Sequence, residues 1–317
     1  MQGSTPSASF LGRIKRGEIG GVALFSDNYR SADGARKLIV KLRAAARAGG
    51  QLPLLIAIDQ EGGKVKRLPG PPTRAPSKMG RISTARAQGF ATGRYLKKFG
   101  INLDLAPVLD VPASPRSFIT SRAFSNNAKA VGNRGTAFAE GLEEGGVAAA
   151  VKHFPGLGRL TVNTDFAPGR VGASQRALAR DLAPFRVAID AGVPAVMVGT
   201  ASYPVYGSKL PAACAPQIVN GLLRQSLGFQ GVILSDDLNT AGVRPVLPFP
   251  ESAVRAVKAG IDIIYVSGVG KNGGDAAGRA AYVALLGAAR QGAISRADLE
   301  ASYERILELK RQVAGAK

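Results

Sequence analysis

Histidine, cysteine and tryptophan are nearly missing from this chain of 317 residues, which holds one His, one Cys and no Trp. A single cysteine excludes an intramolecular disulfide framework, and with a single histidine it argues against a Cys/His metal site. Aromatic residues make up only 6% of the chain, so platforms for stacking single-stranded nucleic acid are scarce. We therefore expect no metal centre.

Long apolar runs and an export signal are also missing. No run approaches the roughly 18 apolar residues of a membrane-spanning helix, so we expect no membrane span. The first ten residues, Met1 to Phe10, are small and polar and lack the pattern of a signal peptide. The compartment, cytoplasmic or exported, and the oligomeric state stay open at this point.

Acidic residues are few compared with basic ones: 22 Asp and Glu against 42 Lys and Arg, a net charge of +20. Such a charge favours an anionic partner, either nucleic acid or an acidic cell-wall polymer. The basic residues are dispersed, however, and no run of five Lys or Arg occurs. This is typical of a solvated surface. We predict no nucleic-acid binding and keep a polyanion adhesin as the weakest alternative.

Short apolar runs alternate with helical patterns along the whole chain. The runs that indicate buried strands are 21–25, 54–59, 101–106, 147–153, 195–199, 231–235 and 261–266. The helical patterns cover 32–48, 82–99, 128–144, 175–191, 215–226, 250–259, 278–290 and 296–313. Buried strands alternating with helices predict an α/β fold with a parallel sheet. No linker interrupts the pattern, which favours one domain over 1–317, with 1–16 extended or partly disordered.

Polar residues follow or end several of these apolar runs, among them Asp59, Lys152, His153 and Asp236. In an open doubly wound sheet such ends would spread along an edge. In a (β/α)8 barrel they converge on one mouth, where the sites of such enzymes lie. We therefore predict a single TIM-type barrel. Because no apolar run precedes Gly21, its first strand is expected to be missing or irregular.

The only histidine, His153, lies in the run Lys152-His153-Phe154-Pro155-Gly156 at the end of the predicted strand 147–153. A cation and an imidazole before a Pro-Gly turn favour a ligand site. The alternative is a core imidazole whose hydrogen bonds are satisfied internally.

Five motifs occur in order: IDQEGGKV at 58–65, LAPVLDV at 105–111, SRAF at 121–124, KHFPG at 152–156 and SDDL at 235–238. Together they closely resemble the N-terminal barrel of glycoside hydrolase family 3, in particular its bacterial β-N-acetylhexosaminidase branch. The resemblance runs from about Gly17 to Lys310. It implies a glycosidase without a cofactor, acting on a small carbohydrate that contains N-acetylglucosamine.

The resemblance also implies roles for individual residues. Retaining glycosidases use a nucleophilic carboxylate and an acid/base, and by resemblance Asp236 is the nucleophile. The residues that match the family's sugar-binding positions are Asp59, Arg67, Arg122, Lys152 and His153. Alternatively, Asp236 caps the following helix, and the two arginines form surface ion pairs.

The acid/base loop departs from the family's pattern. Where this branch has Gly-His-Gly and then Asp-Ser-His, the chain has Gly156-Leu157-Gly158 and Asn163-Thr164-Asp165. In one interpretation Asp165 is the acid/base, with its pKa raised by a closed apolar loop. The lining would come from Leu157, Leu160, Val162 and Phe166. In the other interpretation Asp165 only forms an Asx turn.

Two functional hypotheses follow. The first is a retaining glycosidase that cleaves terminal β-linked N-acetylglucosamine from peptidoglycan or chitin-type fragments through a covalent intermediate on Asp236. The second is a catalytically impaired sugar-binding homologue that has lost the loop Asp–His pair.

One glycine-rich segment, 268–273, fits the G-x-G-x-x-G spacing of a dinucleotide-binding turn. That fingerprint also needs an acidic residue about 20 positions further on and the first strand of a sheet. The segment has neither, so we interpret it as a barrel loop and expect no cofactor.

Overall fold

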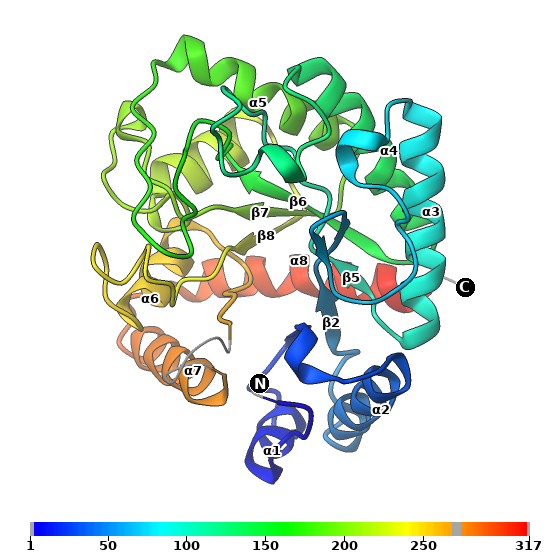
Figure 1. The fold of residues 1–317 in the computed structure, drawn as a ribbon. Coiled ribbons are helices and arrows are strands. Elements are labelled where there is room, and N and C mark those ends of the chain that lie inside the picture. The colour runs from blue at the N-terminus through cyan, green and yellow to red at the C-terminus, as the bar shows by residue number, and fades with distance from the viewer. Residues whose placement is uncertain (1–2, 268–273, 316–317) are drawn as a thin grey trace.

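The computed structural model describes residues 3–267 and 274–315, and the segment 268–273 lies outside them. Six parallel strands form a curled sheet with helices around it (Figure 1). In their order of pairing the strands are β1 (Gly21–Leu24), β2 (Leu55–Ile58), β5 (Leu103–Asp104), β6 (Ala148–Phe154), β7 (Ala195–Val198) and β8 (Val232–Ser235). The predicted α/β class with a parallel sheet is confirmed.

Helices connect these strands, as the sequence pattern predicted. The α-helices of the described residues are α1 (Ala8–Lys15), α2 (Ala32–Ala48), α3 (Ile82–Phe99), α4 (Ala128–Glu144), α5 (Gln175–Asp190), α6 (Glu251–Ala259), α7 (Asp275–Arg290) and α8 (Arg296–Gly315). A π-helical segment, Gln217–Ser226, takes the place of the helix predicted at 215–226. After β2, the short strands β3 (Gln60–Gly62) and β4 (Val65–Lys66) form an antiparallel hairpin.

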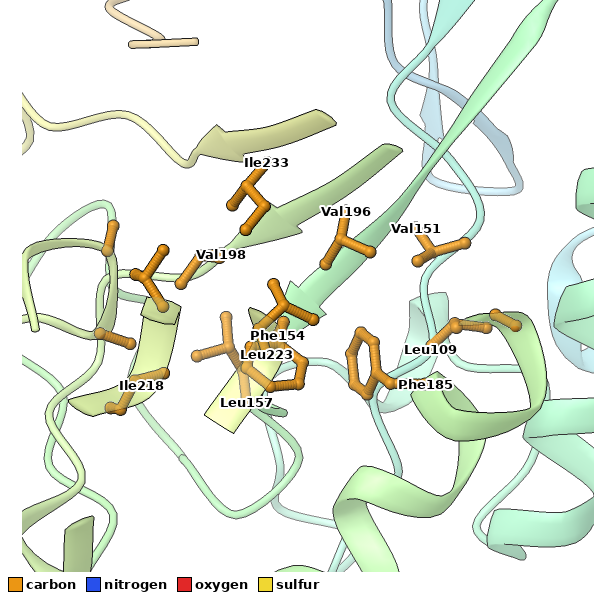
Figure 2. Close-up of a cluster of buried hydrophobic side chains, with 14 of the residues drawn as sticks. Leu109, Val151, Phe154, Leu157, Phe185, Val196, Val198, Ile218, Leu223 and Ile233 are labelled. Carbon is orange, nitrogen blue, oxygen red and sulfur yellow. The ribbon is translucent and has the colours of Figure 1, made fainter. Parts of the chain in front are cut away.

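Side chains alternate between the two faces of the sheet. Inner-face residues such as Ala57 and Ala150 form a small cluster, into which helix α8 inserts Leu309. On the outer face, Val151 and Val196 belong to a larger cluster beneath the helices, as Figure 2 shows. The strands are therefore buried on both faces, which explains why they appear in the sequence as continuous apolar runs.

The curl of the sheet leaves its two edges on either side of a cavity. One edge is β1; at the other, Ile263 extends the sheet by a parallel bridge to Leu234. The cavity, of about 470 Å³, is lined by residues of both edges, including Ala23 and Ile263. The predicted strand 261–266 thus contributes a single bridge to the sheet. The described residues do not close the sheet into a full barrel.

The N-terminal segment 1–16 differs from the expectation of extended chain, because it contains helix α1. Ser7 caps this helix by accepting a hydrogen bond from the Phe10 N–H at 3.1 Å. Phe10 and Ile14 lie four residues apart, hence on one side of the helix, and both are buried in the cluster that includes α2. A helix this short is stabilised by packing rather than by propensity. The local sequence pattern was therefore too weak to predict it.

Helices α3 and α4 pack closely because glycines lie at their contact. A Cβ added at Gly89 of α3 would overlap the carbonyl oxygen of Phe138, and one added at Gly93 would overlap that of Leu142. Any larger side chain at either position would force the two helices apart.

We therefore expect Gly89→Ala to lower the free energy of unfolding by about 1–3 kcal/mol through overpacking. Gly287→Ala is the matched control, because this glycine also lies within a helix, α7, and a Cβ there would meet nothing within 4 Å. The control should be neutral or stabilising by up to about 1 kcal/mol, because alanine has the higher helix propensity. Urea denaturation measures both, and equal effects would contradict the close helix contact.

Candidate active site

Three polar side chains at the carboxyl ends of the strands point to the same side as the inner-face residues of the sheet. Asp59, Lys152 and Asp236 each lie two residues beyond an inner-face residue of β2, β6 and β8. Because successive side chains of a strand alternate between faces, these three point to the same inner side of the curled sheet. The candidate site therefore lies at the carboxyl ends of the strands.

Lys152 joins two carboxylates in a buried network. Its Nζ lies 2.6 Å from Oδ1 of Asp59 and 2.7 Å from Oε1 of Glu61. Arg122 donates to both oxygens of Glu61, from Nη2 at 2.6 Å and from Nε at 2.9 Å. Arg67 lies 3.5 Å from Oδ2 of Asp59. The structure thus joins four predicted sugar-binding residues in one network through Asp59 and Glu61, and the sequence motif suggested no role for Glu61.

The ionisation of this network follows from its mutual charges. Burial by itself raises the pKa of Glu61, but Lys152 and Arg122 outweigh it and lower the value to about 2. Burial lowers the pKa of Lys152, but Asp59 and Glu61 raise it above its ordinary value. Glu61, Lys152 and Arg122 are therefore all charged at neutral pH.

His153 reaches the same site as its neighbour Lys152 because β6 is irregular there. The pairing of β6 with β7 shifts register between Val151 and Phe154. Strict alternation would point adjacent side chains to opposite faces, and an irregularity of this kind re-aims one of them.

Asp110 orients the imidazole of His153. Its Oδ2 lies 2.7 Å from Nδ1 of His153, and its Oδ1 accepts a hydrogen bond from the Leu157 N–H at 2.6 Å. A carboxylate at Nδ1 places the proton there, which leaves Nε2 directed toward Arg122, 3.5 Å away. Asp110 is fully buried and also holds the start of the loop that follows β6.

Asp236, the predicted nucleophile, is partly buried directly after β8. Its Oδ1 accepts a hydrogen bond from the Asp237 N–H at 2.8 Å. Burial raises its pKa, the proximity of His153 lowers it, and the carboxylate of Asp165 raises it. His153 and Asp165 therefore both act electrostatically on the candidate nucleophile. Asp237 accepts a hydrogen bond from the Asn239 N–H at 2.9 Å, which is a turn-stabilising role.

Asp165 lies on an exposed loop and forms a local turn. Its backbone N–H donates to Oδ1 of Asn163 at 3.0 Å, and Nδ2 of Asn163 donates to its carboxylate at 3.1 Å. Of the expected apolar lining, Leu157 and Leu160 are buried, but Val162 and Phe166 are 44% and 77% exposed. The apolar enclosure expected around Asp165 is therefore not formed, because half of its lining faces solvent.

Asp104 lies fully buried beneath this site at the end of β5. Its Oδ1 accepts a hydrogen bond from the Gln60 N–H at 2.9 Å, and its Oδ2 has no partner. Burial raises its pKa to about 8, so the carboxyl is protonated at neutral pH. It joins β5 to the start of β3, between Asp59 and Glu61.

Across residues 3–267 and 274–315, no group of three His, Cys, Asp or Glu residues could hold a metal ion. None of the helices in these ranges is long and apolar enough to cross a membrane.

Strand-end carboxylates beside a cluster of cations, on a curled parallel sheet, are an arrangement that a glycosidase can use. The sequence model of the glycosyl hydrolase family 3 N-terminal domain matches residues 5–309, and the chain belongs to this family of glycosidases. The resemblance noted from the five motifs is thereby confirmed.

Curated relatives include a β-hexosaminidase of Methylobacillus flagellatus, 34% identical over 80% of this chain and 74% of the relative. An uncharacterised secreted glycosyl hydrolase of Arthroderma benhamiae is 33% identical over 98% of the chain and 90% of the relative. Among solved structures, a family 3 β-N-acetylglucosaminidase from Paenibacillus sp. str. FPU-7 is similar with a TM-score of 0.93 and 35% identity. That match covers 99% of this chain but 60% of the Paenibacillus protein.

The buried network predicts a large effect of Glu61→Gln. With one carboxylate fewer, Lys152 and Arg122 are left partly uncompensated, and the free energy of unfolding should fall by about 3–5 kcal/mol. The control is Glu300→Gln in the exposed pair with Arg296, which should change stability by less than about 1 kcal/mol.

The lowered pKa of Glu61 predicts how the free energy of unfolding depends on pH. A carboxylate whose pKa is lowered in the fold contributes stability above its unfolded pKa, and the contribution is lost as the pH falls through the folded value. For Glu61 this window runs from 4.5 down to about 2. Denaturation at several pH values should show the wild type losing more stability across it than Glu61→Gln. Parallel losses would contradict the ion pairing.

Proposed function

We propose that the protein is a retaining β-N-acetylglucosaminidase that releases terminal β-linked N-acetylglucosamine from peptidoglycan or chitin-type fragments. The observation that carries the proposal is the position of Asp236, on the inner side of the sheet and under the influence of His153. The sugar-binding candidates converge on the same side through the network around Lys152 and Asp59. The β-hexosaminidase and β-N-acetylglucosaminidase relatives support the choice of substrate.

In the proposed first step, the carboxylate of Asp236 attacks the anomeric carbon and forms a glycosyl ester. The bond to the aglycone oxygen breaks, and Asp165 protonates that oxygen. In the second step, Asp165 accepts a proton from water, which attacks the same carbon and breaks the ester. Two inversions give a product with retained configuration. Burial raises the pKa of Asp236 overall, and the proximity of His153 opposes that shift in favour of the ionised form that attack requires.

The sugar is bound by the network at the strand ends. Asp59 accepts hydrogen bonds from hydroxyls, while Lys152 and Arg67 donate to sugar oxygens. Arg122 and His153 extend the same binding surface. Because Asp110 bonds Nδ1 of His153, Nε2 is the ring nitrogen that can contact the sugar. Because Glu61 and Asp110 position these donors before substrate arrives, little reorganisation accompanies binding.

We infer further that the six strands are the greater part of a (β/α)8 barrel formed by one domain over 1–317. The polar side chains at the ends of β2, β6 and β8 all point to the inner side of the sheet, which supports strands arranged around one barrel axis. The open side of this barrel lies between β1 and Ile263.

Asp236→Ala should abolish hydrolysis of an aryl N-acetyl-β-glucosaminide, because no group remains to attack the anomeric carbon. Added azide should restore part of the turnover and yield the α-glycosyl azide, since a small anion fits where the carboxylate was. Equal rates in wild type and variant would remove Asp236 from the mechanism.

Asp165→Asn should separate substrates by their leaving groups. An alkoxide leaving group needs protonation, so kcat/KM for a chitin disaccharide should fall by about 10²–10⁴-fold. A nitrophenolate needs little assistance, so the aryl glycoside should lose less than about tenfold. Asn163→Ala, which removes the turn partner but keeps the acid, is the control. Equal losses for both substrates would argue against acid catalysis by Asp165.

A further inference from the structure

Tyr265 occupies the inner face next to the candidate nucleophile. The parallel bridge between Leu234 and Ile263 sets these two residues side by side, and both belong to the inner-face cluster or pack against it. Asp236 and Tyr265 each lie two residues further along, so both continue the inward series. The backbone N–H of Tyr265 donates to Oγ of Ser235 at 2.9 Å, which holds it beside the end of β8.

The phenol of Tyr265 lies among the charged groups of the site. Burial raises its pKa well above the ordinary value, the carboxylates of Asp59, Asp237 and Asp236 raise it further, and Arg67 opposes them. Because burial and these carboxylates raise the pKa of the phenol, Tyr265 is protonated at neutral pH. It is therefore a hydrogen-bond donor located between the tips of β8 and β2.

This donor has no partner within the described residues. A buried tyrosine hydroxyl usually finds a hydrogen-bond partner, as Tyr203 does by donating to the carbonyl oxygen of Gly156 at 2.7 Å. Tyr265 is half-buried, and its hydroxyl makes no such bond within residues 3–267 and 274–315. Nε of Arg67 is also buried without a partner. Two unused donors therefore lie close to the carboxylate of Asp59.

We propose that Tyr265 is a further sugar-binding residue, whose hydroxyl donates a hydrogen bond to an oxygen of the saccharide bound over Asp236. It acts together with Nε of Arg67 on the side of the site between β8 and β1. The inference rests on the proposed function, since it needs a saccharide at this position. Tyr265 also lines the apolar cavity on the open side of the sheet. In this proposal its hydroxyl is the polar group between that cavity and the sugar.

Tyr265→Phe tests this directly, because it removes the hydroxyl and keeps the ring. Since the hydroxyl bonds nothing in the fold, the thermal midpoint should be unchanged or slightly higher. The affinity for N-acetylglucosamine, measured by calorimetry, should fall about three- to tenfold, as expected for one neutral hydrogen bond. The value of kcat/KM for an aryl N-acetyl-β-glucosaminide should fall by a similar factor.

Two control variants define the comparison. Tyr203→Phe removes a hydroxyl that is bonded within the fold, so its thermal midpoint should drop. Tyr303→Phe, on a side chain that is 55% exposed, should change neither stability nor affinity.

The inference is overturned if Tyr265→Phe keeps wild-type affinity and kcat/KM while Asp236→Ala is inactive; the proposed function would then survive. A drop in thermal midpoint as large as that of Tyr203→Phe would assign the hydroxyl to the fold and also overturn it. If the wild type neither binds N-acetylglucosamine nor hydrolyses the aryl glycoside, both the inference and the proposed function fail.

Discussion

The ion network of Lys152, Glu61 and Arg122 is the interaction on which the candidate site depends. It joins the hairpin after β2, the end of β6 and the segment around Arg122, which are far apart in the sequence. Lys152 and Glu61 are almost completely buried, so each charge is stable only beside its partners. The same pairing that holds three segments together also fixes the donors and acceptors that face the inner side of the sheet.

Around this network, buried carboxylates position the side chains that point to the inner side of the sheet. Asp110 holds His153 through Nδ1, and Glu61 holds Arg122 through a forked pair of hydrogen bonds. Asp236 has one carboxylate oxygen engaged by the adjacent backbone N–H, which orients the group. Positioning by buried partners suits a reaction whose transition state requires well-placed charges.

The predictable part of the site followed from local patterns. Asp59, Lys152 and Asp236 could be placed at strand ends because apolar runs stop at them and strands alternate with a period of two. The roles of Glu61 and Asp110 were missed, although both lie inside the recognised motifs, because their partners are 61 and 43 residues away. Tyr265 was missed for the same reason: its neighbours Asp59 and Asp236 lie on other strands.

The sequence alone determined the α/β class, the order of most strands and the family, because burial of a parallel sheet on both faces imposes continuous apolar runs and the motifs are local. The three-dimensional fold was needed to show which charges pair, that segment 8–15 forms a helix, and that the loop carrying Asp165 is exposed. These depend on contacts between distant segments, whose energies come from burial and charge compensation and leave no periodic signal in the chain.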